Sequence, residues 1–153
     1  MKLEHSVTVG APIEVVWAWL MDVPRIATCV PGVASVEAIA DDKFRGTIKV
    51  QVGPIRLSLN GDVWILERDE AAHSASMQAE ASDRAAGGGV KAVLTVALTE
   101  LAPNSTEMRM GTDAQILGRI GDFGLPIIRK KADQVVGDFA RNLQAAIQAH
   151  INS

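Results

Sequence analysis

Three histidines and one cysteine carry the side chains best suited to acid–base, nucleophilic or metal chemistry. His5, His73 and His150 lie far apart in the sequence, without the short spacing of a zinc ligand set, so we predict no metal site. His5 shares one face of a predicted strand with Leu3, Val7 and Val9, which favours a hydrogen-bonded core histidine over a general base, because no proton-transfer partner can be named. Cys29 could act as a nucleophile, but a small buried thiol is the commoner case. We therefore predict no catalytic residue.

Two short motifs invite a phosphate-binding or lipid-binding interpretation. Residues 87–89 are three consecutive glycines, but they lack the Lys-Ser/Thr pair of a phosphate loop and lie between predicted strands, which favours a flexible hairpin. Residues 129–131 form the basic cluster Arg-Lys-Lys on a predicted helix. We prefer the interpretation that this cluster is simply a solvated helix face. The alternative is that it docks to anionic lipid or to a partner enzyme.

Composition excludes several classes of protein. The chain has 153 residues, a net charge of −3 and one cysteine, so neither a basic nucleic-acid-binding face nor an internal disulfide is expected. The N-terminus lacks the apolar core of a signal peptide, and no run approaches the roughly 20 apolar residues of a membrane span. We expect one domain over residues 1–153 in the cytoplasm.

The C-terminal part of the chain predicts one long amphipathic helix, from about residue 126 to residue 149. Apolar residues recur there at steps of three and four, and charged or amide residues fall between them. Such a helix would be about 36 Å long. Its stability must come mostly from packing its apolar stripe, so the rest of the chain must supply a matching surface.

Most of the upstream chain predicts strands. Alternating residues indicate strands at 3–9, 33–40, 43–52, 55–65, 74–80, 90–99 and 108–116, with a helix at 12–21 and a short helical segment at 24–29. Gly61 predicts a bulge or sharp bend inside its strand. Trp19 falls off the apolar face of the first helix, which favours lid or interface packing over ligand contact. Short turns favour an antiparallel sheet, so we expect a curved sheet of about seven strands wrapped around the long helix.

The inward-facing positions of this sheet hold many small or unbranched residues. Ala75, Ala79, Ala92 and Ala114 are examples, and large aromatic side chains are scarce there. Side chains of this size could leave an apolar cavity under the helix, which is the usual character of a small-molecule site. A packed core with methionines as gap fillers explains the same pattern. Composition and periodicity leave both interpretations open.

The order of these elements resembles the helix-grip fold of the START/Bet v 1-like (SRPBCC) superfamily. Within it, short stretches resemble the CoxG family, a group of proteins named for carbon monoxide dehydrogenase. The similar stretches cover nearly the whole chain, and each is weak alone. They are Ala11-Pro12 with Val16-Trp17, Leu20 and Asp22, then Pro31-Gly32-Val33, Val52-Gly53-Pro54 with Gly61, Asp83 with the glycines at 87–89, and Gly118 and Gly124 before the long helix.

The resemblance implies an accessory role rather than catalysis. CoxG proteins assist molybdenum-containing carbon monoxide dehydrogenases and related hydroxylases, and are linked to recruiting the enzyme to the cytoplasmic membrane. In some members the cavity carries a quinone or similar lipid, so no cofactor is required, although a bound quinone or lipid is expected. Many members have a C-terminal membrane-binding extension, whereas this sequence stops at Ser153. By the same resemblance, Pro126 is expected to interrupt and kink a continuous helix.

The function expected from the residues and the resemblance together is a non-catalytic binding protein. It would hold an apolar ligand between sheet and long helix, and link a carbon monoxide dehydrogenase or related hydroxylase to the inner face of the membrane. The alternative is a helix-grip enzyme of the cyclase or isomerase type, for which Thr112 and His73 are the nearest inward acid–base candidates. The predicted ligand-binding cavity comprises Trp17, Leu20, Ile48, Leu57, Leu59, Met77, Ala79, Ala92, Leu94, Met108, Met110, Phe123, Ile127 and Ile128.

Overall fold

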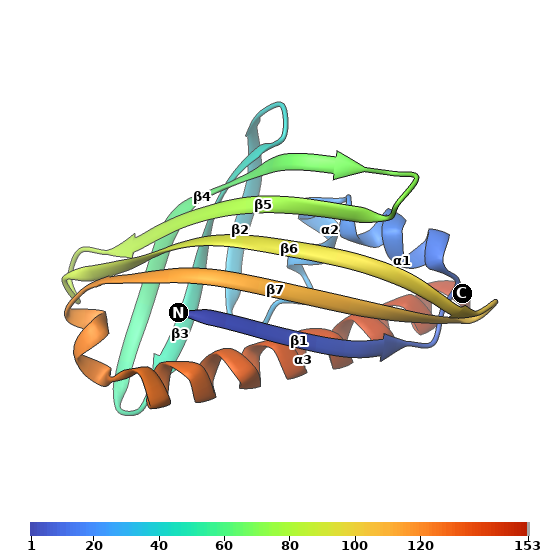
Figure 1. Ribbon diagram of the computed structural model, residues 1–153. Helices are drawn as coiled ribbons and strands as arrows, with labels where there is room; N and C mark the ends of the chain where they lie inside the picture. The colour runs from blue at the N-terminus through green and yellow to red at the C-terminus, as the bar shows by residue number, and fades with distance from the viewer. Residues whose placement is uncertain (153) are drawn as a thin grey trace.

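The computed structural model describes residues 1–152 and shows an α+β helix-grip fold (Figure 1). One curved sheet of seven strands faces a long C-terminal helix. The elements in chain order are β1 (Lys2–Val9), α1 (Ile13–Leu20), α2 (Val23–Ala27), β2 (Val33–Ala40), β3 (Lys43–Val52), β4 (Ile55–Asp69), β5 (Ser74–Asp83), β6 (Gly88–Ala102), β7 (Ser105–Gly118), the 3-10 helix η1 (Arg119–Phe123) and α3 (Leu125–Ile151).

The strand order in the sheet is β1-β7-β6-β5-β4-β3-β2, and every neighbouring pair is antiparallel. Strands β2 to β7 form a continuous meander, because short turns can join only antiparallel neighbours. The N-terminal strand β1 then pairs with β7 at the far edge. The predicted fold class is confirmed, including the number of strands and the single long helix after the last of them.

The long helix α3 begins at Leu125 and ends at Ile151. Pro126 lies in its first turn, where the missing N–H has no intrahelical partner to lose, so the residue starts the helix and the kink expected there is wrong. Gly118 and Gly124 bracket the preceding η1 with φ angles of +67° and +85°. These backbone conformations favour glycine and turn the chain from β7 into α3.

Gly61 has a different role from the predicted one. The pairing of β3 with β4 runs without interruption through Gly46 opposite Gly61, so the bulge expected at Gly61 is wrong. The register shift of β4 lies between Ile65 and Glu67 instead. A Cβ atom on Gly61 would sit 1.9 Å from the carbonyl oxygen of Glu80. Glycine is therefore required because the backbone of β5 approaches closely.

The main core cluster joins α1, the C-terminal half of α3 and the adjacent ends of β1, β5, β6 and β7. Val16, Met108, Leu143 and Ile147 are each 0% exposed within it. Trp19 is only 7% exposed, so the side chain that falls off the apolar face of α1 is packed between elements, in line with the packing role expected for it. It belongs to this cluster, where the guanidinium carbon of Arg25 lies 3.6 Å from its ring centroid.

A second, smaller core cluster closes the opposite end of the molecule. Val52, Leu57 and Leu59 of the β3–β4 hairpin pack there with Ile120 of η1. Asp83 is 9% exposed and joins the β5–β6 turn to β4, because its carboxylate accepts hydrogen bonds from the backbone N–H groups of Ser58 and Ala86. These two bonds lower the pKa of Asp83 below its usual value, the Ser58 bond contributing most.

Candidate functional site

Between the two core clusters, the face of the sheet that looks toward α3 carries two rows of side chains. We call these eight residues the inner floor. In one row they are Ile65, Met77, Leu94 and Thr112, and this row ends on buried Leu3. In the next they are Phe44, Val63, Ala79 and Ala92, and this row ends on buried Ala114. Within each row, neighbouring residues face each other across a strand pair, which places their side chains in contact range.

All eight residues of the inner floor are half-buried, and none belongs to either core cluster. Inward-facing residues of a well-packed core are almost inaccessible, as Met108 and Leu143 are at 0% exposure. The side chains of the floor are thus less tightly covered than those of the two core clusters. Alanine at positions 79 and 92 keeps the side chains short in the middle of the sheet.

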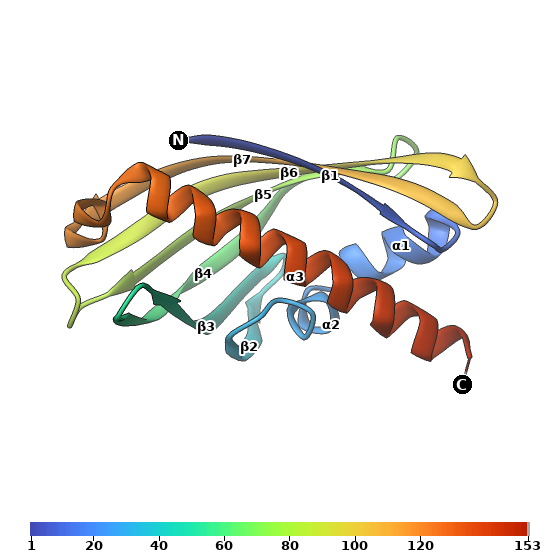
Figure 2. The same cartoon turned by 90° about the horizontal axis from the view of Figure 1, so that it is seen from below.

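Helix α3 crosses over this floor, and its main contacts lie elsewhere. Its main backbone contacts are with β1, β3 and η1, away from the central strands (Figure 2). Leu143 and Ile147 are fully buried, whereas Ile128, Val135 and Val136 nearer its N-terminus are half-buried. The helix is thus anchored by its C-terminal half, and its N-terminal half forms a roof over the inner floor.

One polar contact ties the roof to the sheet. Nε2 of His5, on β1, lies 2.7 Å from Oδ1 of Asp133 on α3. The His5 side chain is 17% exposed, and its Nδ1 atom is buried without a hydrogen-bond partner among residues 1–152. Sequence reasoning predicted a hydrogen-bonded core histidine but could not name Asp133, which lies 128 positions away in a polar stretch of the helix.

The other chemical candidates are separate from this space. Nε2 of His73 lies 2.8 Å from the Glu14 carboxylate and the ring packs edge-on against Trp17, so this histidine fastens α1 to the β4–β5 turn. Cys29 is a buried thiol at 2% exposure, as predicted. In the described part of the chain, no group of three histidine, cysteine or acidic residues could hold a metal ion.

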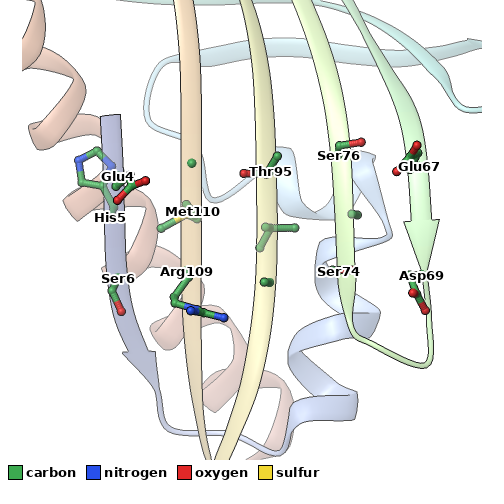
Figure 3. A pocket seen from close by; sticks show the side chains of 14 residues that line it. Glu4, His5, Ser6, Glu67, Asp69, Ser74, Ser76, Thr95, Arg109 and Met110 are labelled. Carbon is green, nitrogen blue, oxygen red and sulfur yellow. The ribbon is translucent and has the colours of Figure 1, made fainter. Parts of the chain in front are cut away.

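A hollow that the sequence did not predict lies on the opposite, outer face of the sheet. It has a volume of about 590 Å³ and crosses β1, β7, β6, β5 and β4 (Figure 3). Small outward residues such as Ser74, Ser76 and Gly111 line it, with Glu4 and Arg109 at one side. Short outward side chains on adjacent strands were the available signal. Charged side chains, among them Glu67 and Arg109, stand around this hollow, although more of its exposed surface is apolar than polar.

The fourteen predicted cavity residues fall into four groups. Met77, Ala79, Ala92 and Leu94 lie on the inner floor. Trp17, Leu20, Met108 and Met110 belong to the main core cluster or pack against it, and Ile48, Leu57, Leu59 and Phe123 do so at the second cluster. Ile127 is 52% exposed and Ile128 half-buried on the first turns of α3. Their role in ligand binding stays a prediction.

A curved antiparallel sheet gripping one C-terminal helix defines a protein of the START/Bet v 1-like helix-grip class. The chain belongs, within that class, to the carbon monoxide dehydrogenase CoxG family, whose family model matches residues 6–148. The predicted family is thereby confirmed. No curated protein sequence matches the chain.

Solved structures share the fold at low sequence identity. A conserved protein from Geobacillus kaustophilus has a TM-score of 0.89 and 19% identity, covering 97% of this chain and 96% of that one. A START superfamily protein from Mycobacterium smegmatis has a TM-score of 0.74 and 15% identity, with 97% of each chain covered. The Zhui aromatase/cyclase from Streptomyces sp. R1128 has a TM-score of 0.73 and 16% identity, covering 99% of this chain and 95% of that one.

Proposed function

We propose that this protein binds an apolar small molecule, a quinone or another lipid, between the inner floor and helix α3. The observation that carries the proposal is the half-buried, almost wholly apolar inner floor, which lies under a helix anchored mainly at its other end. Concave, mostly apolar spaces with few polar groups are the usual small-molecule sites of proteins. Binding rather than catalysis fits the scarcity of acid–base groups that face this space.

We further propose that the protein is an accessory factor of a carbon monoxide dehydrogenase or a related molybdenum hydroxylase. Membership of the CoxG family supports this partner. The ligand would then pass between the enzyme and the inner face of the cytoplasmic membrane. Within residues 1–152 no helix has the length and apolarity to cross a membrane. The proposed membrane contact is peripheral, and exposed Leu125 and Ile127 beside the basic residues 129–131 supply a suitable surface.

Organic extraction followed by mass spectrometry, together with native mass spectrometry of the intact protein, tests the binding proposal directly. We expect a quinone or lipid at near-equal stoichiometry, or uptake of added ubiquinone by protein purified without ligand. Protein that is empty and also fails to take up quinone would refute the carrier role. The dehydrogenase partnership is tested independently by pull-down of the purified enzyme.

A large side chain introduced on the inner floor tests where the ligand binds. Ala92 faces Ala79 on the inner floor, and a phenylalanine there would occupy the volume in which the ligand is proposed to lie. We expect Ala92→Phe to abolish quinone uptake while leaving the circular dichroism spectrum unchanged. Val93→Phe is the matched control, because Val93 is the next residue of the same strand, points to the outer face and is 40% exposed. Equal uptake by the two variants would place the ligand elsewhere.

The His5–Asp133 pair favours a second candidate function, an enzyme of the cyclase or isomerase type. A histidine held by a carboxylate can act as a general base toward a bound hydrophobic substrate. The fold similarity to an aromatase/cyclase makes this chemistry worth testing. Turnover of an aromatic polyketide-like substrate that is lost in His5→Phe would support it, and binding without turnover would support the carrier role.

A further inference from the structure

The two edge strands of the sheet, β1 and β2, are protected to very different degrees. Helix α3 packs beside β1, where Arg129 donates a hydrogen bond to the carbonyl oxygen of Lys2 and Gln148 donates one to that of Gly10. At the other edge, six of the eight residues of β2 are exposed (Figure 2). Within residues 1–152, no hydrogen bond joins the backbone of residues 34–40 to any element other than β3. The outer edge of β2 can therefore accept another strand.

The sequence of β2 lacks the residues that usually keep an exposed edge from pairing with another chain. Such edges commonly carry lysine, proline or an inward-pointing charge. Strand β2 reads Val-Ala-Ser-Val-Glu-Ala-Ile-Ala, with neither lysine nor proline and with Glu37 as its only charge. Its two register shifts against β3 fall near its ends, and residues 35–38 pair without interruption. The centre of this edge is thus regular and almost uncharged.

The residues of β2 are arranged almost symmetrically about Val36. On each side of Val36 come a polar residue, an alanine and a β-branched apolar residue, in that order. When two identical strands pair antiparallel with their two-fold axis at Val36, residues equally far from the axis face each other. Ser35 of each copy then faces Glu37 of the other, and its hydroxyl group can donate to that carboxylate. An axis at Glu37 would instead bring two carboxylates face to face, which is destabilising.

We infer that the protein forms a two-fold symmetric dimer in which β2 pairs antiparallel with β2 of a second copy. The partner is a second copy because the match about Val36 is a match of this strand with itself. The two sheets then join edge to edge, and a two-fold axis perpendicular to the sheet places both copies of α3 on the same side. This dimer is independent of ligand binding and goes beyond the proposed function.

Sedimentation equilibrium of the purified protein measures the association. We expect the mass to rise with concentration from the monomer value of 16.3 kDa toward twice that value. The dissociation constant should be on the order of 10 µM, because the pairing of two short strands buries a small interface. A mass that stays at the monomer value at millimolar protein would overturn the inference.

Position 35 allows a charge to be placed opposite Glu37 of the other copy, on a side chain that is exposed. Ser35→Glu is expected to weaken the dimer about tenfold and Ser35→Lys to strengthen it, since each dimer contains the facing pair twice. Ser82→Glu is the matched control, because Ser82 is an exposed serine on the central strand β5. Ser35→Glu combined with Glu37→Ser keeps the composition and restores the facing pair, so it should recover wild-type association. Equal association of Ser35→Glu and Ser35→Lys would contradict the proposed register.

A cysteine at the two-fold axis reports the geometry directly. Residues that face each other in an antiparallel pair have Cα atoms roughly 4.5–5.5 Å apart, which is within the range of a disulfide. Val36→Cys is therefore expected to form a disulfide-linked dimer on mild oxidation, seen by non-reducing electrophoresis. Ala38→Cys is the matched control, because residue 38 is exposed and faces Ala34 of the other copy rather than its own counterpart. The native Cys29 is 2% exposed and should not react. Equal linking of the two variants would show that β2 does not pair about Val36.

Discussion

Three isoleucines on α3 allow the packing of the helix to be measured with one substitution. Ile147 is 0% exposed in the main core cluster, Ile128 is half-buried outside both clusters, and Ile127 is 52% exposed. Replacing each by alanine removes the same three carbon atoms from the same helix. The differences in unfolding free energy therefore report how closely the sheet packs against each part of α3.

The expected costs follow from the burial of each side chain. For Ile147→Ala, three methylene-sized groups at about 0.8 kcal/mol each, with the penalty of the remaining cavity, give a loss of about 3–4 kcal/mol. In a chain of this length that lowers the melting temperature by roughly 6–16 °C. For Ile128→Ala we expect about 1 kcal/mol, because the side chain is only partly removed from water and leaves no closed cavity. Ile127→Ala should stay within about 0.5 kcal/mol of wild type.

Equilibrium urea unfolding of ligand-free protein, followed by tryptophan fluorescence and far-ultraviolet circular dichroism, measures these values. The slope against urea should be equal in all three variants, so that midpoints translate into free energies. If Ile128→Ala cost as much as Ile147→Ala, the N-terminal half of α3 would be packed as tightly as the C-terminal half. That result would refute the open space above the inner floor, and with it the physical basis of the binding proposal.

Two further predictions concern the close backbone approach at Gly61 and the loss of stability at low pH through Asp83. Gly61→Ala should destabilise the protein by about 1–3 kcal/mol in urea unfolding, because the new Cβ would meet the Glu80 carbonyl oxygen at 1.9 Å. Gly121→Ala, whose nearest neighbour would be 3.9 Å away, should be nearly neutral, and equal effects would contradict the close-approach explanation. For Asp83, the lowered pKa means that its stabilising effect is complete above the ordinary value of 3.8 and fades as the pH falls below it. Asp83→Asn should flatten that acid loss of stability, and an unchanged pH profile would show that the two backbone contacts are unimportant.

The fold was predictable because its signals are local. Alternation marked every strand, and a sustained period of three to four marked α3, so element type followed from spacing alone. Pro126 shows where local reasoning was misled by the expected continuity of the helix. In the structure η1 and the Gly124 turn separate the two segments, which leaves proline in a first turn where it is well tolerated.

The interior was harder to predict because it depends on distances between elements that are remote in sequence. Alternation identified Met77, Ala79, Ala92 and Leu94 as inward-facing, and they lie together on the inner floor. The same reasoning could not separate them from Met108, which also faces inward but is 0% exposed. Met108 and the four floor residues all alternate with outward-facing residues along their strands. Only the placement of α3 distinguishes the packed residue from the accessible ones. For the same reason the sequence predicted packing for Trp19 without naming its partners, which are Arg25 of α2 and His150 near the end of α3.

The two core clusters place the tightest packing of the chain at the two ends of the molecule. An internal space forfeits packing and hydrophobic stabilisation, so a protein that keeps one must gain stability elsewhere. Here the main cluster secures α1 and the C-terminal half of α3, and the second cluster ties the β3–β4 hairpin to η1. The inner floor between them belongs to neither core cluster and contributes little to the packing of the chain. Its residues are consequently free to be small, and a bound ligand would add stability by mass action on the folded state alone. Such an arrangement is consistent with selection of the floor for binding rather than for folding.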